Sequence, residues 1–263
     1  MELQRRAKDL QDQGLGLAVV TYDPPEVLKR FADQYGITFP LLSDAGSAII
    51  KSYGLLNTGN AEGSRAYGVP FPGTFMLDRR GVVVSRYFEE AYQERNTVAS
   101  ILTREGHGIG SGPAQSVTTA HIAVQAAASD GVVSPGSRFS LSLEVTPRPG
   151  MHVYAPGKHT YQKVTFTIDA RSWLKAYPLT YPPSQIYYFA PLDERVEVYE
   201  KGFTLVQDLT VLATSEVQKQ LAGQKTLTVS GRLEYQACDD KVCYAPTAVP
   251  MSFTLDLTPL LRP

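Results

Sequence analysis

Two cysteines are the residues of this sequence whose type and spacing most directly suggest chemistry. Cys238 and Cys243 are the only cysteines among the 263 residues, and the four residues Asp239-Asp240-Lys241-Val242 separate them. The flanking segments 233–237 and 244–246 are typical of two antiparallel strands joined by a polar turn, so the cysteines are predicted to face each other across a hairpin. Opposed residues of antiparallel strands lie about 4.5–5.5 Å apart at Cα, which a disulfide can bridge.

A disulfide at this position would contribute little as a structural crosslink. Closing a ring of about six residues removes roughly 2 kcal/mol of denatured-state entropy, against about 3 kcal/mol for a 15-residue loop. If Leu233, Tyr235 and Ala237 point into the core, Cys238 points off that face, where an exchanging sulfur is expected, unless a bulge at Gly231 reverses the alternation. A redox pair, an inert hairpin disulfide and two unreactive thiols remain the alternatives.

Charges around the cysteines oppose one another. Lys241 would stabilise a thiolate, whereas Asp239 and Asp240 would disfavour it. We expect neither a metal nor a cofactor, because a zinc site needs a second ligand pair and the histidines do not supply one. They are scattered at positions His107, His121, His152 and His159.

Composition excludes several functional classes. The 25 basic and 26 acidic residues give a net charge of −1, which removes the electrostatic signature of a nucleic-acid binder. Apolar runs all fall short of the ~20 residues that a membrane-spanning helix needs. The chain is therefore expected to be a globular protein without a membrane span.

The elements that would position the cysteines lie in the second part of the chain. Phe139, Leu141, Leu143 and Val145 alternate with polar residues, and later segments up to the C-terminus follow the same period of two. Many short strands with one buried face and Pro/Gly-rich turns predict an antiparallel β-sandwich over residues 117–263.

The first part of the chain mixes helical and strand patterns in the order α-β-α-α-β-β-α over residues 1–104. Segments 74–77 and 82–87 are predicted to form a hairpin through Asp78-Arg79-Arg80-Gly81, and 97–102 a helix that closes this domain. The Gly-rich stretch 106–113 predicts a linker over residues 105–116. Glu89, Glu90 and Glu94 are interpreted as a solvated charge cluster.

Three motifs in the second part resemble the N-terminal periplasmic domain of the thiol:disulfide interchange protein DsbD. They are GMHVYAPG at 150–157, VEVYE at 196–200 with Phe203, and the cysteine hairpin followed by Tyr244-Ala245-Pro246. The resemblance covers roughly residues 117–258. It implies an immunoglobulin-like sandwich whose cysteine pair cycles between dithiol and disulfide, passing electrons from a membrane transducer to oxidised periplasmic proteins.

The resemblance also implies roles for individual residues. Cys243 would form the mixed disulfide with a thioredoxin-like partner or membrane electron transducer, and Cys238 would resolve it. His152 and Tyr154 would be aromatic neighbours of the sulfurs, with Tyr244 beside the hairpin. The segment 189–194 would be a cap that shields the sulfurs, although Leu192 stands where the family has an aromatic residue.

The first part resembles a peroxiredoxin or redoxin domain of the AhpC/TSA type, on the thioredoxin fold. The similar stretches are AVVTYD at 18–23, FPLLSD at 39–44, Tyr53-Gly54, and FPGTFMLD at 71–78 with Gly81. The resemblance implies that Pro72 is the cis-proline facing the active site, and the alternative is a trans proline that opens a strand.

This first domain lacks the central strand and the reactive cysteine of its family, so two strand edges and apolar surface are expected to stay unpaired. Either the chain is truncated or the domain is degenerate and kept for docking. The main hypothesis is extracytoplasmic thiol-disulfide exchange through Cys238 and Cys243, which would make the chain a thiol-disulfide oxidoreductase. The alternatives are a docking module with a structural disulfide, and a peroxiredoxin-type antioxidant whose reactive cysteine lies upstream of Met1.

Overall fold

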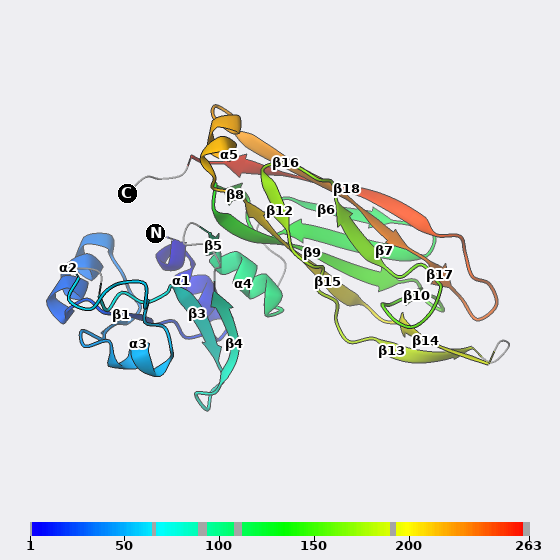
Figure 1. The fold of residues 1–263 in the computed structure, drawn as a ribbon. Helices are drawn as coiled ribbons and strands as arrows, with labels where there is room; N and C mark the ends of the chain where they lie inside the picture. Colours follow the sequence, from blue (N-terminus) through cyan, green and yellow to red (C-terminus); the bar gives the residue numbers. More distant parts are fainter. Residues whose placement is uncertain (1, 65–66, 89–93, 108–111, 190–192, 260–263) are drawn as a thin grey trace. The chain divides into compact units, whose positions relative to one another are not determined.

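The computed structural model divides the chain into two compact units, residues 1–92 and 93–263. The structure describes residues 2–64, 67–88, 94–107, 112–189 and 193–259 (Figure 1). Within these residues, every helix is too short or too polar to cross a membrane.

Unit 1 is an α/β unit with two small sheets. Strands β1 and β2 pair in parallel, and strands β3 and β4 pair antiparallel. Strand β2 was not among the predicted elements, because its three residues are too few to show a period. The described elements are α1 (Glu2–Asp12), β1 (Val19–Thr21), α2 (Pro25–Tyr35), β2 (Leu41–Ser43), α3 (Ala48–Ser52), β3 (Gly73–Leu77) and β4 (Val83–Phe88).

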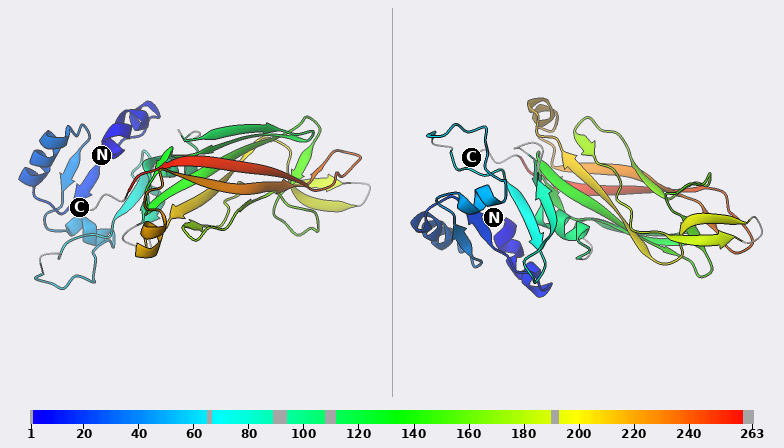
Figure 2. Two further views of the ribbon diagram at one scale, coloured as in Figure 1. Left: turned by 90° about the horizontal axis from the view of Figure 1, so that it is seen from above. Right: turned by 60° about the horizontal axis from the view of Figure 1, so that its bottom comes forward.

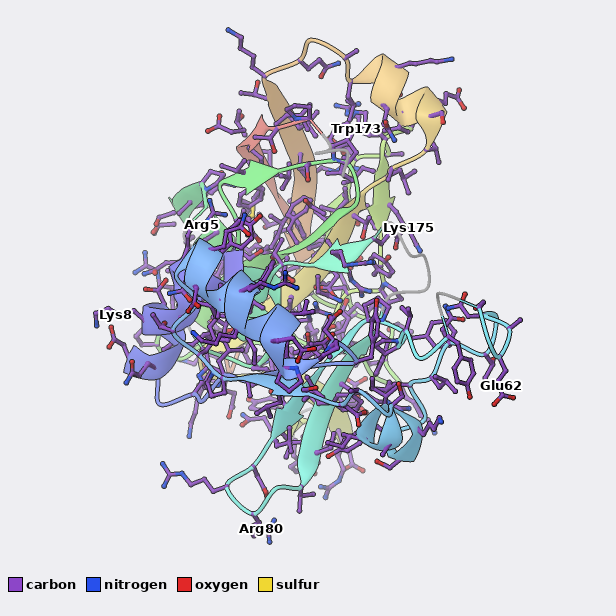
Figure 3. All side chains as sticks on the ribbon, turned by 90° about the vertical axis from the view of Figure 1, so that its left-hand side faces the viewer. Arg5, Lys8, Glu62, Arg80, Trp173 and Lys175 are labelled. Carbon is purple, nitrogen blue, oxygen red and sulfur yellow. A yellow bond between two sulfur atoms is a disulfide. The ribbon has the colours of Figure 1, made fainter. Side chains whose placement is uncertain are left out.

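Local sequence signals fix the ends of these elements. Helix α2 begins with Pro25, whose missing N–H costs nothing in a first turn, and it is capped after Tyr35 by Gly36 in the left-handed conformation with φ of 61°. The predicted hairpin of β3 and β4 is confirmed. The carboxylate of Asp78 accepts hydrogen bonds from the backbone N–H groups of Arg80 and Val82, with Arg80 in the turn (Figure 3).

The two sheets of unit 1 are not joined to each other in the described residues. Several apolar side chains on them are exposed, among them Val20, Leu42 and Val84. This arrangement agrees with the expectation that a missing central strand leaves edges and apolar surface unpaired.

The prediction of a cis-proline at Pro72 is wrong. The described peptide bonds, including the one before Pro72, are all trans. Strand β3 begins at Gly73, directly after this residue. Pro72 is therefore a trans proline that opens a strand, which is the isomer favoured by about 0.5–1 kcal/mol in the absence of other constraints.

Unit 2 is built on two large sheets whose long strands run lengthwise through it (Figure 2). The first sheet has the order β12-β15-β9-β7-β6, with β5 paired to β9, and the second has the order β11-β16-β18-β8. The strands of the first are β5 (Arg95–Asn96), β6 (Ala114–Thr118), β7 (Ile122–Ala128), β9 (Ser137–Pro147), β12 (Leu174–Ala176) and β15 (Phe203–Val211). Those of the second are β8 (Val132–Val133), β11 (Thr165–Ile168), β16 (Thr226–Tyr235) and β18 (Thr247–Leu257).

The main core lies between these two sheets. The alternating apolar residues of β9, from Phe139 to Val145, are fully buried and pack with those of β16 and β18. Pairing of β16 with β18 runs without a break through Gly231, so the alternation that leads to the cysteines contains no bulge. The predicted sandwich and its inward-facing residues are confirmed.

A third, smaller sheet lies at one end of unit 2 (Figure 1) and has the order β13-β14-β10-β17. It packs a second, separate cluster of buried side chains that includes Tyr154, Val196, Val198 and Cys238. Its strands are β10 (His152–Tyr154), β13 (Gln185–Phe189), β14 (Glu194–Tyr199) and β17 (Ala237–Cys238). Helix α5 (Ser215–Gln220) lies at the opposite end.

The division between the units falls earlier than predicted. Helix α4 (Val98–Arg104) was expected to close the first domain, but it packs on β9 and β15, and β5 pairs with β9. Five consecutive residues of α4 are buried, and its Arg104 forms an ion pair with Asp208 of β15. Residues 93–104 therefore belong to unit 2.

Two related predictions also need correction. The predicted linker 105–116 is partly sheet, because β6 begins at Ala114; its residues 108–111 lie outside the described residues. Glu94 is only 8% exposed and accepts a hydrogen bond from the Tyr177 hydroxyl at 3.1 Å, so it is not a solvated charge. Glu89 and Glu90 lie outside the described residues.

Candidate redox site

The two cysteines form a disulfide across the predicted hairpin. Their Cα atoms lie 4.1 Å apart. The backbone N–H of Asp239 donates to the carbonyl of Val242 at 3.0 Å, and that of Tyr244 donates to Ala237 at 2.9 Å. Because these bonds lie on either side of the cysteine pair, Cys238 and Cys243 occupy a non-hydrogen-bonded position, where side chains of opposed residues are closest.

The turn between the cysteines is held by the carboxylate of Asp239. Its Oδ1 accepts the backbone N–H groups of Lys241 at 2.7 Å and Val242 at 2.6 Å, and its Oδ2 accepts the Tyr244 hydroxyl at 2.9 Å. These hydrogen bonds, the backbone ones first, hold the pKa of Asp239 below its ordinary value. The hairpin therefore has fixed geometry that does not depend on the disulfide alone.

The two sulfur-bearing residues differ sharply in exposure. Cys238 is 1% exposed, whereas Cys243 belongs to the exposed class. As the alternation predicts, Ala237 faces the main core and Cys238 faces the other way. The prediction that this places Cys238 at the surface is wrong, because side chains of the neighbouring strands β10 and β14 bury it, and the accessible residue is Cys243.

The hydroxyl of Tyr154 lies against both sulfur atoms. Its oxygen is 3.1 Å from Sγ of Cys238 and 3.4 Å from Sγ of Cys243. Disulfide sulfurs carry no hydrogen, so the hydroxyl is the donor in both contacts. Burial raises the pKa of Tyr154 far above the ordinary value, and the side chain stays neutral and able to donate.

Two further residues support Tyr154: Tyr161, which the sequence did not single out, and Glu194, which ends the predicted cap segment. The ring of Tyr161 stacks on it, with centroids 4.1 Å apart and planes 4° apart. The Tyr161 hydroxyl in turn donates to Oε2 of Glu194 at 2.7 Å, and this bond raises the pKa of Tyr161. No local motif marks these residues, since Tyr161 lies in the β10–β11 loop and Glu194 at the start of β14.

His152 is placed beside the sulfurs, as predicted. It stands opposite Cys238 in the pairing of β10 with β17, is 4% exposed, and packs its ring 4.4 Å from that of Tyr187. Burial lowers the pKa of His152, which favours the neutral imidazole.

A small pocket lies over the disulfide, and the two ends of the predicted cap segment line it. Phe189 and Glu194 face each other in the pairing of β13 with β14, and both line this pocket together with the cysteines. Leu192, the predicted cap residue, lies outside the described residues. Tyr244 is half-buried, and its ring packs 4.3 Å from that of His121.

The described residues hold no cluster of three or more histidine, cysteine or acidic side chains suited to a metal ion. The site thus consists of a disulfide, a hydroxyl donor, a neutral imidazole and aromatic rings. These groups suit exchange at sulfur, in which a thiolate attacks one sulfur and the other leaves.

Two family models match this chain. The AhpC/TSA family model matches residues 1–86, and the model for the N-terminal domain of the thiol:disulfide interchange protein DsbD matches residues 119–254. These matches and the strand-rich architecture confirm the predicted fold classes. Residues 1–86 are a thioredoxin-like α/β fragment, and the second unit is an immunoglobulin-like sandwich.

Curated relatives are similar to the first unit. A Mycobacterium tuberculosis protein named as a peroxiredoxin is 35% identical over 80 residues, covering 30% of this chain and 50% of the relative. The thiol-disulfide oxidoreductase ResA of Halalkalibacterium halodurans is 29% identical over 77 residues, covering 29% of this chain and 36% of ResA. The chain thus spans about half or less of the length of these relatives.

Among solved structures, the N-terminal periplasmic domain of ScsB from Proteus mirabilis is similar to this chain, with a TM-score of 0.37 and 19% sequence identity. The superposition covers 54% of this chain and 49% of the ScsB chain.

Proposed function

The chain belongs to the family of the N-terminal domain of the thiol:disulfide interchange protein DsbD, and on that premise we propose that Cys238 and Cys243 exchange electrons with the cysteines of a partner protein. The observation that carries the proposal is the asymmetry of the disulfide. One of its residues is exposed, the other is 1% exposed, and a tyrosine hydroxyl lies within hydrogen-bond distance of both sulfurs.

The asymmetry assigns a role to each sulfur. A thiolate of the partner attacks Sγ of Cys243, the accessible end, and the bond between the two cysteines breaks. A mixed disulfide forms, and Cys238 departs with the electron pair as a thiolate. Attack of a second partner thiolate on the mixed disulfide then releases Cys243, so that the partner is oxidised and this chain gains two electrons and, from solvent, two protons.

Tyr154 supports the departure of Cys238. A buried thiolate lacks water as a hydrogen-bond donor, and its charge would otherwise be costly. The neutral Tyr154 hydroxyl, 3.1 Å from that sulfur, supplies the donor. Hydrogen bonds to a charged group are worth about 1.5–3 kcal/mol, enough to lower the barrier to the step.

The Asp239 turn favours reversibility. Since its hydrogen bonds to Lys241, Val242 and Tyr244 do not involve sulfur, the hairpin keeps its shape when the disulfide is reduced. The thiols then stay close enough to re-form their bond, as an electron carrier requires.

A thioredoxin-like protein is the partner class we propose, and an extracytoplasmic compartment the location. The family's description supports the first, because it names thiol:disulfide interchange. The disulfide supports the second, since such bonds persist mainly in oxidising compartments. The alternative of a peroxiredoxin-type antioxidant would require a reactive cysteine upstream of Met1, because residues 1–92 contain no cysteine.

A docking module with a purely structural disulfide is the second candidate, and the burial of Cys238 favours it. A redox titration in glutathione or dithiothreitol buffers, read by alkylation and mass spectrometry, separates the two candidates. Exchange predicts a reduction potential above about −300 mV together with rapid reaction with a reduced thioredoxin. A potential far below about −300 mV would instead establish the structural role.

A further inference from the structure

Building on the proposed exchange, we propose that Glu194 and Tyr161 are positioning residues that act on the buried sulfur through Tyr154. The contacts form one continuous series. Glu194 accepts the Tyr161 hydroxyl at 2.7 Å, the Tyr161 ring lies flat on the Tyr154 ring at 4.1 Å, and the Tyr154 hydroxyl reaches Cys238 at 3.1 Å.

The series begins at a fixed point of the backbone. Glu194 is the first residue of β14 and stands opposite Phe189 at the end of the ladder that joins β13 to β14. Tyr161, by contrast, comes from the β10–β11 loop and belongs to no strand. The hydrogen bond from the Tyr161 hydroxyl to Glu194 therefore fixes the Tyr161 ring in its stacked position on Tyr154.

Tyr161 controls where the Tyr154 hydroxyl can go. A tyrosine side chain has two rotatable bonds, and neighbours determine the position of its ring. The Tyr154 ring packs edge-on against the His152 ring, with centroids 5.6 Å apart, and face to face against the Tyr161 ring, with centroids 4.1 Å apart. When Tyr161 is released from Glu194, the Tyr154 ring gains freedom, and its hydroxyl spends less time on Cys238.

The step that these residues affect can be isolated with a small thiol. A dithiothreitol thiolate attacks Sγ of Cys243, forms a mixed disulfide and expels Cys238 as a thiolate. The second thiolate of dithiothreitol then attacks the dithiothreitol sulfur that is bonded to Cys243, the bond to Cys243 breaks, and the products are cyclic oxidised dithiothreitol and the Cys243 thiolate. Solvent protonates both cysteines, and no partner protein is needed.

The experiment measures the rate constant of this reduction in the full chain and in matched variants. Tyr154→Phe should slow reduction about ten- to a hundredfold, because it removes a hydrogen bond to a developing charge. Tyr161→Phe keeps the stacked ring and loses the bond to Glu194, and Glu194→Gln weakens the acceptor. Each should slow reduction about three- to tenfold.

The decisive variants are the double ones. If Tyr161 and Glu194 act through the Tyr154 hydroxyl, then adding Tyr161→Phe or Glu194→Gln to Tyr154→Phe should cause no further slowing. Tyr188→Phe is the matched control, because it removes a hydroxyl bonded to Asp193 at 2.9 Å on the same hairpin without lining the pocket. Its rate should equal that of the wild type.

Two results would overturn the proposal. Unchanged reduction in both Tyr161→Phe and Glu194→Gln would show that the pair positions nothing, and an equal slowing in the presence and absence of the Tyr154 hydroxyl would show an independent effect. Glu194→Gln, the conservative variant, keeps the test valid if Tyr161→Phe fails to fold. Failure of the exchange function itself would look different, since the wild type would then react with dithiothreitol but not with a thioredoxin.

Discussion

His152 stands directly opposite Cys238 in the antiparallel pairing of β10 with β17. Cys238 therefore has an imidazole as its cross-strand partner on β10, and burial keeps the pKa of that imidazole below its ordinary value. The neutral ring next to Cys238 provides packing, and the hydrogen bond to the Cys238 sulfur comes from the Tyr154 hydroxyl.

The lowered pKa of His152 predicts a specific dependence of stability on pH. Above about pH 6.5 the ring is neutral in the folded and unfolded states and contributes no pH dependence. Below that value the histidine binds a proton more readily in the unfolded state than in the folded state. The free energy of unfolding therefore decreases as the pH is lowered. Between about pH 7.5 and 5.5 the loss should stay under about 1.4 kcal/mol, and urea unfolding at both values measures it.

Substitution should remove this dependence. His152→Phe is expected to lose less stability than the wild type over the same pH interval, because phenylalanine cannot titrate. His107→Phe, at a histidine outside the cysteine site, should behave like the wild type. An unchanged pH dependence in His152→Phe would contradict the account of a buried neutral imidazole.

The Asp239 turn predicts the behaviour of the reduced protein. Asp239→Ala removes the acceptor for the N–H groups of Lys241 and Val242 and for the Tyr244 hydroxyl. The reduced hairpin should then open more often, and re-formation of the disulfide should slow by about tenfold. Reoxidation with oxidised glutathione, stopped at successive times by alkylation of the remaining thiols, measures this rate.

Asp239→Asn is the matched control for the turn, since asparagine also accepts backbone N–H groups in such turns. It should reoxidise within about threefold of the wild type. Equal rates for the alanine variant and the wild type would show that the strands alone keep the two thiols together.

The assignment of α4 to the second unit predicts the role of Asp208. Its carboxylate is shared by Arg104 of α4 at 3.2 Å, Arg138 of β9 at 3.1 Å and the Ser140 hydroxyl at 2.6 Å. Because both arginines are largely buried, Asp208→Ala should destabilise unit 2 by about 2–4 kcal/mol.

Denaturant unfolding of Asp208→Ala, compared with the exposed Asp256→Ala, tests this prediction. The Asp256 variant should stay within about 0.5 kcal/mol of the wild type. A similarly small effect for Asp208→Ala would mean that the ion cluster does not hold α4 on the sandwich.

The features of the site that the sequence predicted are those encoded locally. A strand, a polar turn and a second strand specify the hairpin. The unbroken alternation of Leu233, Tyr235 and Ala237 correctly predicts that Cys238 faces away from the main core. His152 and Tyr154 were predicted from a motif, and β10 brings both to the sulfurs.

The features that it missed depend on contacts between distant segments. Alternation shows which way Cys238 faces, but not that β10 and β14 cover that face with Tyr154, Val196 and Val198. Likewise, Tyr161 and Glu194 are 33 residues apart, and their hydrogen bond has no signature in either segment. The helical period of α4 revealed a helix, but not which unit buries it.

Trapping a mixed disulfide shows whether Cys243 is the accessible end of an exchanging disulfide and Cys238 the buried one. A reduced thioredoxin that lacks its second cysteine is mixed with the oxidised chain, and mass spectrometry of the digested complex locates the new bond. We expect a bond to Cys243, with Cys238 recovered as a free thiol. A bond to Cys238, or no complex under conditions in which dithiothreitol reduces the disulfide, would contradict this expectation.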